Sequence, residues 1–398
     1  AGAAYLDYLL QYVNTTSSSL LDLNYPTTRY GDWCAPLPLG NTQARHTSNI
    51  INGFFWIKQL RIMTNAAKTL GFNKDEEKWS TLETHASKSF NELYFSKKKG
   101  FYEDIECMNP TEKNIRPCHN STIGADGEMS KQTAQALPLF LDLPSSINDK
   151  VRVGNALAED VLNGIYPGRT TAGLVGTKYI LSELVKSGHS DVALKIATSV
   201  EYPSWGYMLP SSIHPAGQGE GTLWERWKGD KHTGFGSRNH IMLGGFDGPF
   251  FYGNLAGIQN DGIAWSNILI APTVAGDLSG VAASVATIRG LISVKWNVLE
   301  DAVGKFLINV TVPHGTTGVI HLPILQEKNN NITANDVNVL ESGICFWKAK
   351  VGYISESVPG IDMAKSGSNL AGKFIEVIIQ SGTYEFDLTV VAKDYLKI

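Results

Sequence analysis

Apolar residues recur at helical spacing along the first half of the chain. One stripe holds eight apolar side chains, Ile50, Ile51, Phe54, Phe55, Ile57, Leu60, Ile62 and Met63. A second stripe, within residues 74–95, holds Trp79, Leu82, Ala86, Phe90 and Leu93. Because an amphipathic helix turns one face to the core at this period, the stripes predict two helices that pair as a hairpin. Gly71 stands where the first helix should end, as its C-cap.

The same period recurs in shorter segments, which we predict to be helices at 4–13, 130–141, 147–163, 174–187 and 190–198. Short links that carry Gly or Pro separate them. Helices that follow one another without intervening strands favour antiparallel hairpins. Such hairpins can close into a ring or stack as an open solenoid, and the number of helices does not distinguish these two arrangements.

From about residue 275 the period of the pattern changes to two. Runs such as GLISVKWNVLED, KFLINVTVPHG and GKFIEVIIQSGTYEFDLTVV alternate apolar and polar residues and end in Gly-rich turns. This alternation predicts an antiparallel β-sandwich. We therefore expect an α + β multidomain chain, with a helical domain at 1–272, a β-sandwich at 273–398, and a seam at 253–275.

The composition of the 398-residue chain narrows the classes of partner. It is 43% hydrophobic and 18% charged, with a net charge of −4, and has no basic run interleaved with aromatic residues, so we expect no nucleic-acid partner. No stretch approaches the roughly twenty apolar residues of a transmembrane helix, so we expect no membrane span. The first residues, AGAAYLDYLLQYV, resemble an amphipathic helix rather than a signal peptide, although a signal could have been removed before this numbering begins.

The four cysteines are too few for a disulfide framework. Cys107 and Cys118 bracket a polar, Pro-containing segment, which predicts a local disulfide, with two free thiols as the alternative. Because no second pair of residues stands at the spacing of metal ligands, we expect no metal and no other cofactor. Four N-glycosylation sequons add to this pattern and together favour a secreted or extracellular protein of eukaryotic type, at Asn14, Asn120, Asn309 and Asn331.

The segment from Tyr202 to His240 concentrates aromatic residues around one acid. Glu225 stands between Trp224 and Arg226, and further Trp and Tyr residues lie close by in sequence. Aromatic rings offer flat apolar faces to the C–H side of a pyranose, and an acid can address its hydroxyl groups. The segment therefore suggests a sugar-binding or sugar-cleaving site, with an aromatic core segment that carries one exposed Glu as the alternative.

Several motifs of the chain resemble the catalytic half of the α-L-rhamnosidases of glycoside hydrolase family 78. They are, in chain order, YGDWCAP, KQTAQALPLFLDL, TTAGLVGTKYILSELVKSGHSDVALKI, PSWGYML, TLWERW and SRNH, and the resemblance covers residues 1 to 300. It implies that the helices close into an (α/α)6 toroid. It also implies inverting hydrolysis of terminal α-L-rhamnosyl groups, with a rhamnose-containing glycoside or polysaccharide as substrate.

The resemblance assigns roles to individual residues. Glu225 matches the general base. Asp32 and Trp33 match a Gly-Asp-Trp motif on an active-site loop whose Trp shapes the rhamnose subsite, so the resemblance implies that both residues bind the substrate; a structural turn is the alternative. His240 matches a position that hydrogen-bonds the sugar, and the alternative is a structural histidine. Two further rings would either line the pocket or pack the inner wall of the toroid, namely Trp205 and Trp224.

The chain departs from the family pattern upstream of Asp32. Family members carry an acidic motif there, D-x-x-x-x-x-E-R-x-G-W-x-G-D, which supplies the general acid, and nothing comparable occurs in this sequence. Three interpretations follow. The toroid is incomplete at its N-terminus and a preceding segment or chain of the same protein supplies the acid, or the protein is a degenerate relative that binds sugar or is structural, or it is another toroidal sugar-active protein such as a polysaccharide lyase.

Overall fold

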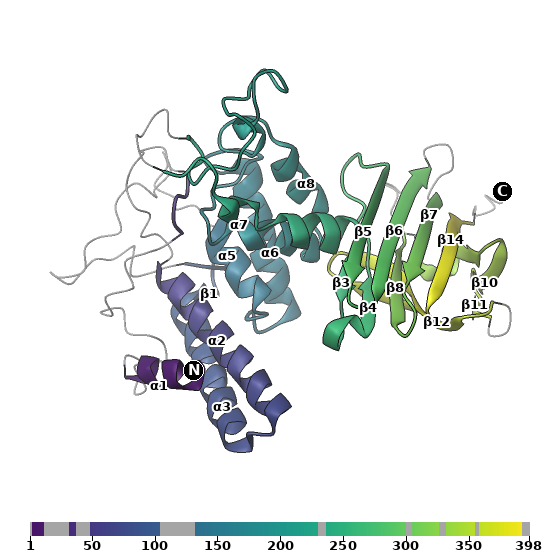
Figure 1. Cartoon of the computed structure of the whole chain (residues 1–398), viewed down its shortest axis with the longest axis horizontal. Coiled ribbons are helices and arrows are strands. Elements are labelled where there is room, and N and C mark those ends of the chain that lie inside the picture. The colour runs from purple at the N-terminus through teal and green to yellow at the C-terminus, as the bar shows by residue number, and fades with distance from the viewer. Residues whose placement is uncertain are drawn as a thin grey trace. The chain divides into compact units, whose positions relative to one another are not determined.

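The structure is a computed structural model that describes residues 2–11, 32–36, 48–103, 132–229, 236–299, 305–325, 332–354 and 358–391. The chain divides into two compact units, Ala1–Gly245 and Phe246–Ile398 (Figure 1). The first unit is helical and the second is built of strands, in the order that the sequence predicts. Each unit is described by itself below.

Seven α-helices form the described part of the first unit: α1 (Gly2–Leu10), α2 (Ser48–Leu70), α3 (Asn73–Tyr94), α5 (Gln132–Phe140), α6 (Ile147–Asn163), α7 (Thr177–Lys186) and α8 (Ser190–Thr198). All seven match the helices predicted from the apolar period. A short hairpin, β1 (Phe95–Ser96) with β2 (Phe101–Tyr102), follows α3. Helix α2 packs against α3, α5 against α6 and α7, and α7 against α8, as helical hairpins require (Figure 1).

Local sequence signals set the ends of these helices. Gly71 has a φ of +75°, which confirms it as the left-handed C-cap of α2. Ser146 is the N-cap of α6, and its hydroxyl oxygen accepts a hydrogen bond from the backbone N–H of Asp149 at 3.1 Å. The buried face of α6 then repeats at every fourth residue, at Val153, Leu157 and Val161.

The second unit begins with a π-helix, η5 (Gly248–Leu255), and a short 3-10 helix, η6 (Ile263–Trp265). Its seven-stranded sheet has the order β11 (Gly352–Tyr353), β10 (Ile344–Lys348), β9 (Val337–Glu341), β14 (Gly382–Val390), β7 (Lys305–Val312), β6 (Gly290–Leu299) and β5 (Gly280–Thr287). Its five-stranded sheet has the order β12 (Ile361–Asn369), β13 (Gly372–Ile379), β8 (Thr317–Pro323), β4 (Asn267–Ile270) and β3 (Ile258–Asn260). Another 3-10 helix, η7 (Ala334–Asp336), precedes β9.

The five-stranded sheet differs from the antiparallel expectation at one pairing. Strands β4 and β8 run parallel, from Asn267 opposite Thr317 to Ile270 opposite Ile320. Strands β5, β6 and β7 lie between them in sequence and belong to the other sheet, so the chain returns by a crossover connection instead of a hairpin. Strands β3 and β4 lie in the stretch that we expected to be the seam, and they pair within this sheet.

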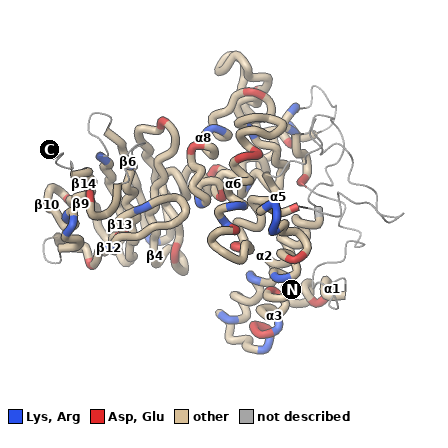
Figure 2. The backbone as a smooth tube through the Cα atoms, turned by 180° about the vertical axis from the view of Figure 1, so that it is seen from behind, with Lys and Arg blue, Asp and Glu red and all other residues tan. Residues whose placement is uncertain are grey.

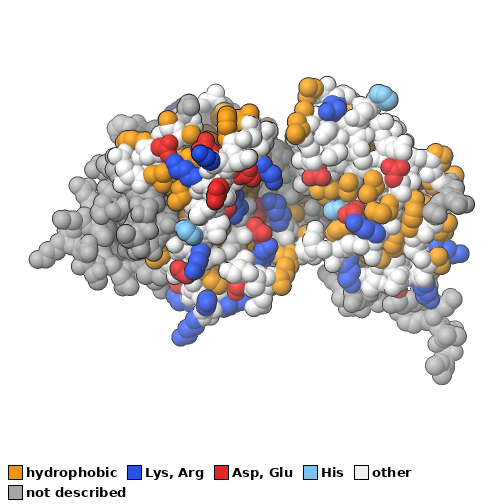
Figure 3. Space-filling model, turned by 90° about the horizontal axis from the view of Figure 1, so that it is seen from below, with side chains coloured by type: hydrophobic (Ala, Val, Ile, Leu, Met, Phe, Trp, Pro, Cys, Tyr) orange, Lys and Arg blue, Asp and Glu red, His pale blue; other side chains and the backbone are white. Residues whose placement is uncertain are grey.

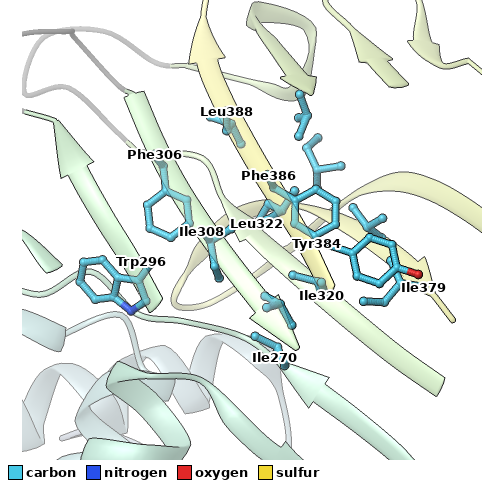
Figure 4. Close-up of a cluster of buried hydrophobic side chains, with 14 of the residues drawn as sticks. Ile270, Trp296, Phe306, Ile308, Ile320, Leu322, Ile379, Tyr384, Phe386 and Leu388 are labelled. Atoms are coloured by element: carbon cyan, nitrogen blue, oxygen red, sulfur yellow. The ribbon is translucent and has the colours of Figure 1, made fainter. Parts of the chain in front are cut away.

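The core of the second unit lies between its two sheets. Alternate residues of each strand face this core, as the period-two pattern predicts. Among them Trp296, Phe306 and Phe386 are fully buried. The Trp296 indole N–H also donates to the Leu255 carbonyl at 2.8 Å, which satisfies its polar group inside the core. Figure 4 shows the side chains that meet there from both sheets, among them Ile270, Ile308, Ile320, Leu322, Ile379, Tyr384 and Leu388.

The surfaces of the described residues are mixed in character. Figure 2 shows Lys and Arg interspersed with Asp and Glu along both units, in keeping with the small net charge of −4. On the face seen in Figure 3, apolar side chains form small groups among polar and charged atoms. In the part of the chain that the structure describes, no helix is both long and apolar enough to cross a membrane.

Candidate active site

The Tyr202–His240 segment follows α8 and carries its aromatic rings inward. Its described residues form no α-helix, only a short 3-10 turn, η2 (Gly206–Met208), and a second one, η4 (Ile241–Gly244), follows it. Trp224 is 7% exposed and Trp227 is 1% exposed, and both belong to a hydrophobic cluster with Met208 and Leu243. This cluster fixes the backbone from which Glu225 projects.

Trp205 and Trp224 take part in that packing. The Trp205 ring lies edge-on to Trp227, with ring centroids 5.4 Å apart, and its indole N–H donates to the Leu243 carbonyl at 2.9 Å. Trp224 is buried, and its ring lies where a Cβ at Gly219 or Gly229 would be 2.8 Å or 2.7 Å away. Both rings therefore pack on their own segment, Trp224 as a buried residue and Trp205 as a half-buried one, and a contact of either ring with a sugar stays a prediction.

Glu225 and Trp33 meet although they are 192 residues apart in sequence. The Trp33 indole N–H donates to Glu225 Oε1 at 3.1 Å. The backbone N–H of Ser237 donates to Glu225 Oε2 at 2.9 Å, and the Glu225 N–H donates to the Ser237 carbonyl at 2.9 Å. Each carboxylate oxygen thus has one fixed donor, and the two donors come from distant segments.

These donors keep Glu225 ionised. The backbone N–H of Ser237, and then the Trp33 indole, lower the pKa of the Glu225 carboxyl against the opposing effect of desolvation. Electrostatic interactions with His240 and Arg226 lower this pKa further. Among the described residues each oxygen has one donor for its two lone pairs, and such a partly exposed, ionised carboxylate is suited to accept a proton from water.

Asp32 lies inside the protein, with 3% of its surface exposed. Its Oδ2 accepts from the N–H of Gly173 at 2.6 Å and from the Thr133 hydroxyl. Its Oδ1 accepts from the N–H groups of Val175 at 2.9 Å and Gly176 at 3.1 Å. Burial raises the pKa of Asp32 above its ordinary value, while these four hydrogen bonds lower it.

The loop at 170–176 connects the parts of the site. Leu174 donates its N–H to the Trp33 carbonyl at 2.8 Å, and the Trp227 indole N–H donates to the Ala172 carbonyl at 2.8 Å. From α5, the Gln132 side chain accepts from the Thr171 N–H at 2.8 Å. Three of the motifs that carry the family resemblance, YGDWCAP, KQTAQALPLFLDL and TLWERW, therefore meet at this loop, which itself belongs to a fourth, TTAGLVG.

His240 lies beside this carboxylate. Its backbone N–H donates to the Leu223 carbonyl at 2.7 Å, and its ring is close enough to act on the charge of Glu225. Its Nδ1 is buried and has no hydrogen-bond partner among the described residues. His240 therefore lies near Glu225, and its hydrogen bond to a sugar stays a prediction.

Sequence reasoning missed several residues of the site. Ser237 contributes a backbone N–H, which every non-proline residue carries, so no side-chain pattern points to it. Thr133 donates to Asp32, and Gly173 and Gly176 lack a side chain, which lets the loop approach Trp33 and Thr133 closely. Cys34, next to Trp33, is also part of this environment, where burial raises the pKa of its thiol to about 11.

The remaining predicted sites are described only in part. Cys107, Cys118, Asn14, Asn120 and Asn331 lie outside the described residues. Asn309 is exposed on β7. Of the cysteines in the described ranges, Cys34 and Cys345, neither is in a disulfide. Across those same ranges, no group of three or more His, Cys, Asp or Glu side chains is arranged to hold a metal ion.

Comparison with known proteins gives one consistent family. The model of the bacterial α-L-rhamnosidase six-hairpin glycosidase domain matches residues 2–255, and the model of the α-L-rhamnosidase C-terminal domain matches residues 257–335. An α-L-rhamnosidase of Streptomyces avermitilis is 25% identical over 320 residues, which are 79% of this chain and 26% of that protein. One of Formosa agariphila is 25% identical over 339 residues, 82% of this chain and 32% of that protein.

Two solved structures share the fold. The α-L-rhamnosidase from Dictyoglumus thermophilum superposes with a TM-score of 0.75 at 26% identity, over 98% of this chain and 36% of that one. The Streptomyces avermitilis α-L-rhamnosidase complexed with L-rhamnose gives a TM-score of 0.67 at 20% identity, over 97% of this chain and 30% of that one. The chain thus spans about a quarter to a third of the length of the curated relatives, 26% and 32% in the two cases above.

Proposed function

The chain belongs to the bacterial α-L-rhamnosidase family, and from this membership we propose that the whole protein is a glycoside hydrolase that removes terminal α-L-rhamnosyl groups from rhamnosides. The family model of the six-hairpin glycosidase domain covers the whole of the candidate site. A relative of the same fold has been solved with L-rhamnose. These similarities support the class of substrate, a rhamnose-containing glycoside or polysaccharide.

One observation carries the proposed mechanism: Glu225 is held ionised by two donors on separate segments, Trp33 and Ser237. In an inverting reaction, the base removes a proton from water as the water oxygen bonds to the anomeric carbon. The bond from that carbon to the leaving oxygen breaks on the opposite face, and a general acid protonates the leaving oxygen. We assign the first of these two proton transfers to Glu225.

We further propose that the general acid belongs to a segment outside the described residues. The charged groups that shift the pKa of Glu225 are His240 and Arg226, and no second carboxylate is among them in the described part of the chain. The sequence also contains no counterpart of the family's acidic motif. In inverting enzymes the two carboxyl groups stand about 6.5–9.5 Å apart, which leaves room for the water.

The absence of this motif from the 398 residues supports one rival function, a relative that binds rhamnosides without cleaving them. Incubating the whole protein with an aryl α-L-rhamnoside and with methyl α-L-rhamnoside separates the two. The aryl leaving group hardly needs a proton, whereas the methoxide leaving group does. An enzyme that has both a general base and a general acid therefore cleaves both substrates. Binding of L-rhamnose without turnover of either substrate would establish the rival and refute the hydrolase.

The stereochemistry of the product tests the role of the base. Inversion releases β-L-rhamnose first from an α-linked substrate, and proton NMR during the first minutes of reaction resolves the anomers before they equilibrate. Initial release of the α anomer would show retention, and Glu225 would then be a nucleophile or an acid–base residue instead of the activator of water.

We also propose that the protein is secreted. The combination of the Cys107–Cys118 spacing with a sequon at Asn120 supports this, because disulfides and N-glycans form in the secretory pathway. Treatment of the protein from its native source with an N-glycosidase should lower its apparent mass. Unchanged mass, together with two alkylatable thiols at these cysteines, would refute secretion through that pathway.

A further inference from the structure

We propose that Asp32 is a positioning residue for the catalytic base, and that it acts by holding the Trp33 indole on Glu225 without contacting the sugar. The proposal rests on the proposed function only for the catalytic role of Glu225. The positioning itself is a property of the fold. It revises the sugar-binding role that the Gly-Asp-Trp resemblance implied for Asp32.

The hydrogen bonds of Asp32 leave it no capacity for a sugar hydroxyl. A carboxylate has about four lone-pair sites in all. Four donors occupy them, two on each oxygen: Thr133 and Gly173 on Oδ2, Val175 and Gly176 on Oδ1. Asp32 is also buried, with only 3% of its surface exposed. A substrate could therefore reach this carboxylate only after the loop had come apart.

The same contacts fix the backbone of Trp33. Its carbonyl accepts from Leu174 at 2.8 Å, so residues 32 and 33 are both tied to the loop. A Cβ added at Gly173 would lie 2.2 Å from the Trp33 carbonyl oxygen, and one at Gly176 would lie 2.0 Å from the Thr133 hydroxyl oxygen. Only glycine lets the two segments approach this closely.

The loop is tied to the other half of the site as well. The Trp227 indole N–H donates to the Ala172 carbonyl at 2.8 Å, and Trp227 stands two residues after Glu225 in a tightly packed segment. Asp32 therefore holds Trp33 against the loop, and Trp227 holds the Glu225 segment against the same loop. This arrangement fixes the 3.1 Å distance between the Trp33 indole nitrogen and Glu225 Oε1.

The Asp32 carboxylate also lies at the start of helix α7. Val175 and Gly176 immediately precede α7, and Gly176, its N-cap, has no capping side chain of its own. Asp32, from a distant segment, accepts from the N–H groups of these two residues at the helix start, where a negative group is favoured by the helix dipole. Its removal should therefore disturb both the start of α7 and the position of Trp33.

The first test compares pH profiles of kcat/KM for the whole protein. In Asp32→Asn, an amide N–H₂ replaces an acceptor and faces backbone donors, so the turn must shift and the Trp33 contact weaken. Because that contact lowers the pKa of Glu225, its loss moves the acid limb of the profile to higher pH, as Trp33→Phe also should. The other groups around Glu225, His240, Arg226 and Cys34, are unchanged in both variants.

The magnitudes and the control distinguish positioning from a general loss of stability. We expect a plateau loss of up to about 10² in kcat/KM, mostly in kcat, since a displacement of about 1 Å at a reacting group costs that much. The double variant Asp32→Asn, Trp33→Phe should shift the acid limb no further than Trp33→Phe alone. Gln135→Met on α5 breaks two buried hydrogen bonds, both to the backbone of Tyr102 and neither to Asp32, Trp33 or Glu225, so it should leave the acid limb in place.

A second measurement needs no turnover. The indole N–H resonance of Trp33, identified by its loss in Trp33→Phe, should move as Glu225 titrates and should stop moving in Glu225→Gln. In Asp32→Asn the resonance should lose most of this response, and Thr133→Val, which removes one of the four donors, should lose part of it if Asp32→Asn does not fold. If the coupling is found in a protein without rhamnosidase activity, the proposed function fails and the positioning role stands.

Two results would overturn the positioning role. One is an Asp32→Asn enzyme with an unchanged acid limb and an unchanged Trp33 response. The other is a double variant whose acid limb moves by the sum of the two single shifts, because additive shifts mean that the residues act on Glu225 independently.

Discussion

The Glu225→Gln variant tests the centre of the proposed mechanism. Gln has nearly the size and shape of Glu, but its amide carries no charge and one of its terminal atoms is a donor. It can accept from the Trp33 indole or from the Ser237 N–H, and cannot accept from both. The variant therefore removes the base and also leaves one of the two donors unpaired.

The two effects differ in size. General base catalysis contributes roughly 10²–10⁴ in rate, which is about 2.7–5.4 kcal/mol at 1.36 kcal/mol for each tenfold. The unpaired donor costs about 1 kcal/mol of stability, because water reaches this partly exposed site and replaces part of the lost hydrogen bond. For a unit of the size of Ala1–Gly245, about 1 kcal/mol lowers the Tm by roughly 2–4 °C. The variant should thus be folded at 25 °C and almost inactive.

The assay follows hydrolysis of an aryl α-L-rhamnoside by the whole protein, with thermal unfolding measured in parallel. Glu220→Gln is the matched control, since Glu220 lies on the same segment, is exposed, and forms a long ion pair of 3.9 Å with Arg238. We expect wild-type rates from the control. Added azide should restore part of the rate of Glu225→Gln, because this anion attacks without losing a proton, and the product should be the β-rhamnosyl azide.

The reasoning is refuted if Glu225→Gln keeps more than about a tenth of the wild-type rate at its pH optimum, since loss of a general base costs at least about a hundredfold. A Tm fall much larger than about 4 °C would instead mean that the carboxylate stabilises the fold more than its two hydrogen bonds suggest.

Three further predictions concern stability and covalent structure. Phe386→Ala, in the core of the second unit, should lower the free energy of unfolding by about 3–5 kcal/mol in urea denaturation, and a loss below about 1 kcal/mol would contradict its burial. Contacts with Lys365 and His321 lower the pKa of Glu376 below its ordinary value of 4.5, so they stabilise the fold above that pH and are lost as the pH falls through the lowered pKa. Glu376→Gln should therefore be destabilised at pH 7 and match wild type well below pH 4.5; a pH-independent difference would refute this. Peptide mapping without reduction should recover Cys107 bonded to Cys118 and a glycan on Asn120, and separate alkylated cysteines would exclude the disulfide.

The sequence alone was sufficient for the seven α-helices and for strands such as β6, β7, β13 and β14, but not for the β1–β2 hairpin or for β3 and β4. An apolar period of 3.6 or two depends on which residues face the core of one element, so it can be read over ten or twenty residues without knowledge of the partners. Gly71 likewise ends α2 for a local reason, its left-handed φ of +75°. The same local pattern could not predict that β4 pairs parallel to β8, because the partner strand lies beyond three strands of the other sheet.

For the candidate site, the sequence identified the residues and the tertiary structure decided their contacts. The order of the motifs pointed to Glu225 and Trp33, but only the fold shows that an indole N–H, 192 residues away, lies on the carboxylate. Asp32 is the clearest case. Its identity suggested a polar group for the substrate, whereas the backbone N–H groups that surround it have no signature in the sequence, since almost every residue carries one. Whether a carboxylate faces a ligand or the protein depends on which backbone donors the fold brings to it, and that is a property of long-range packing.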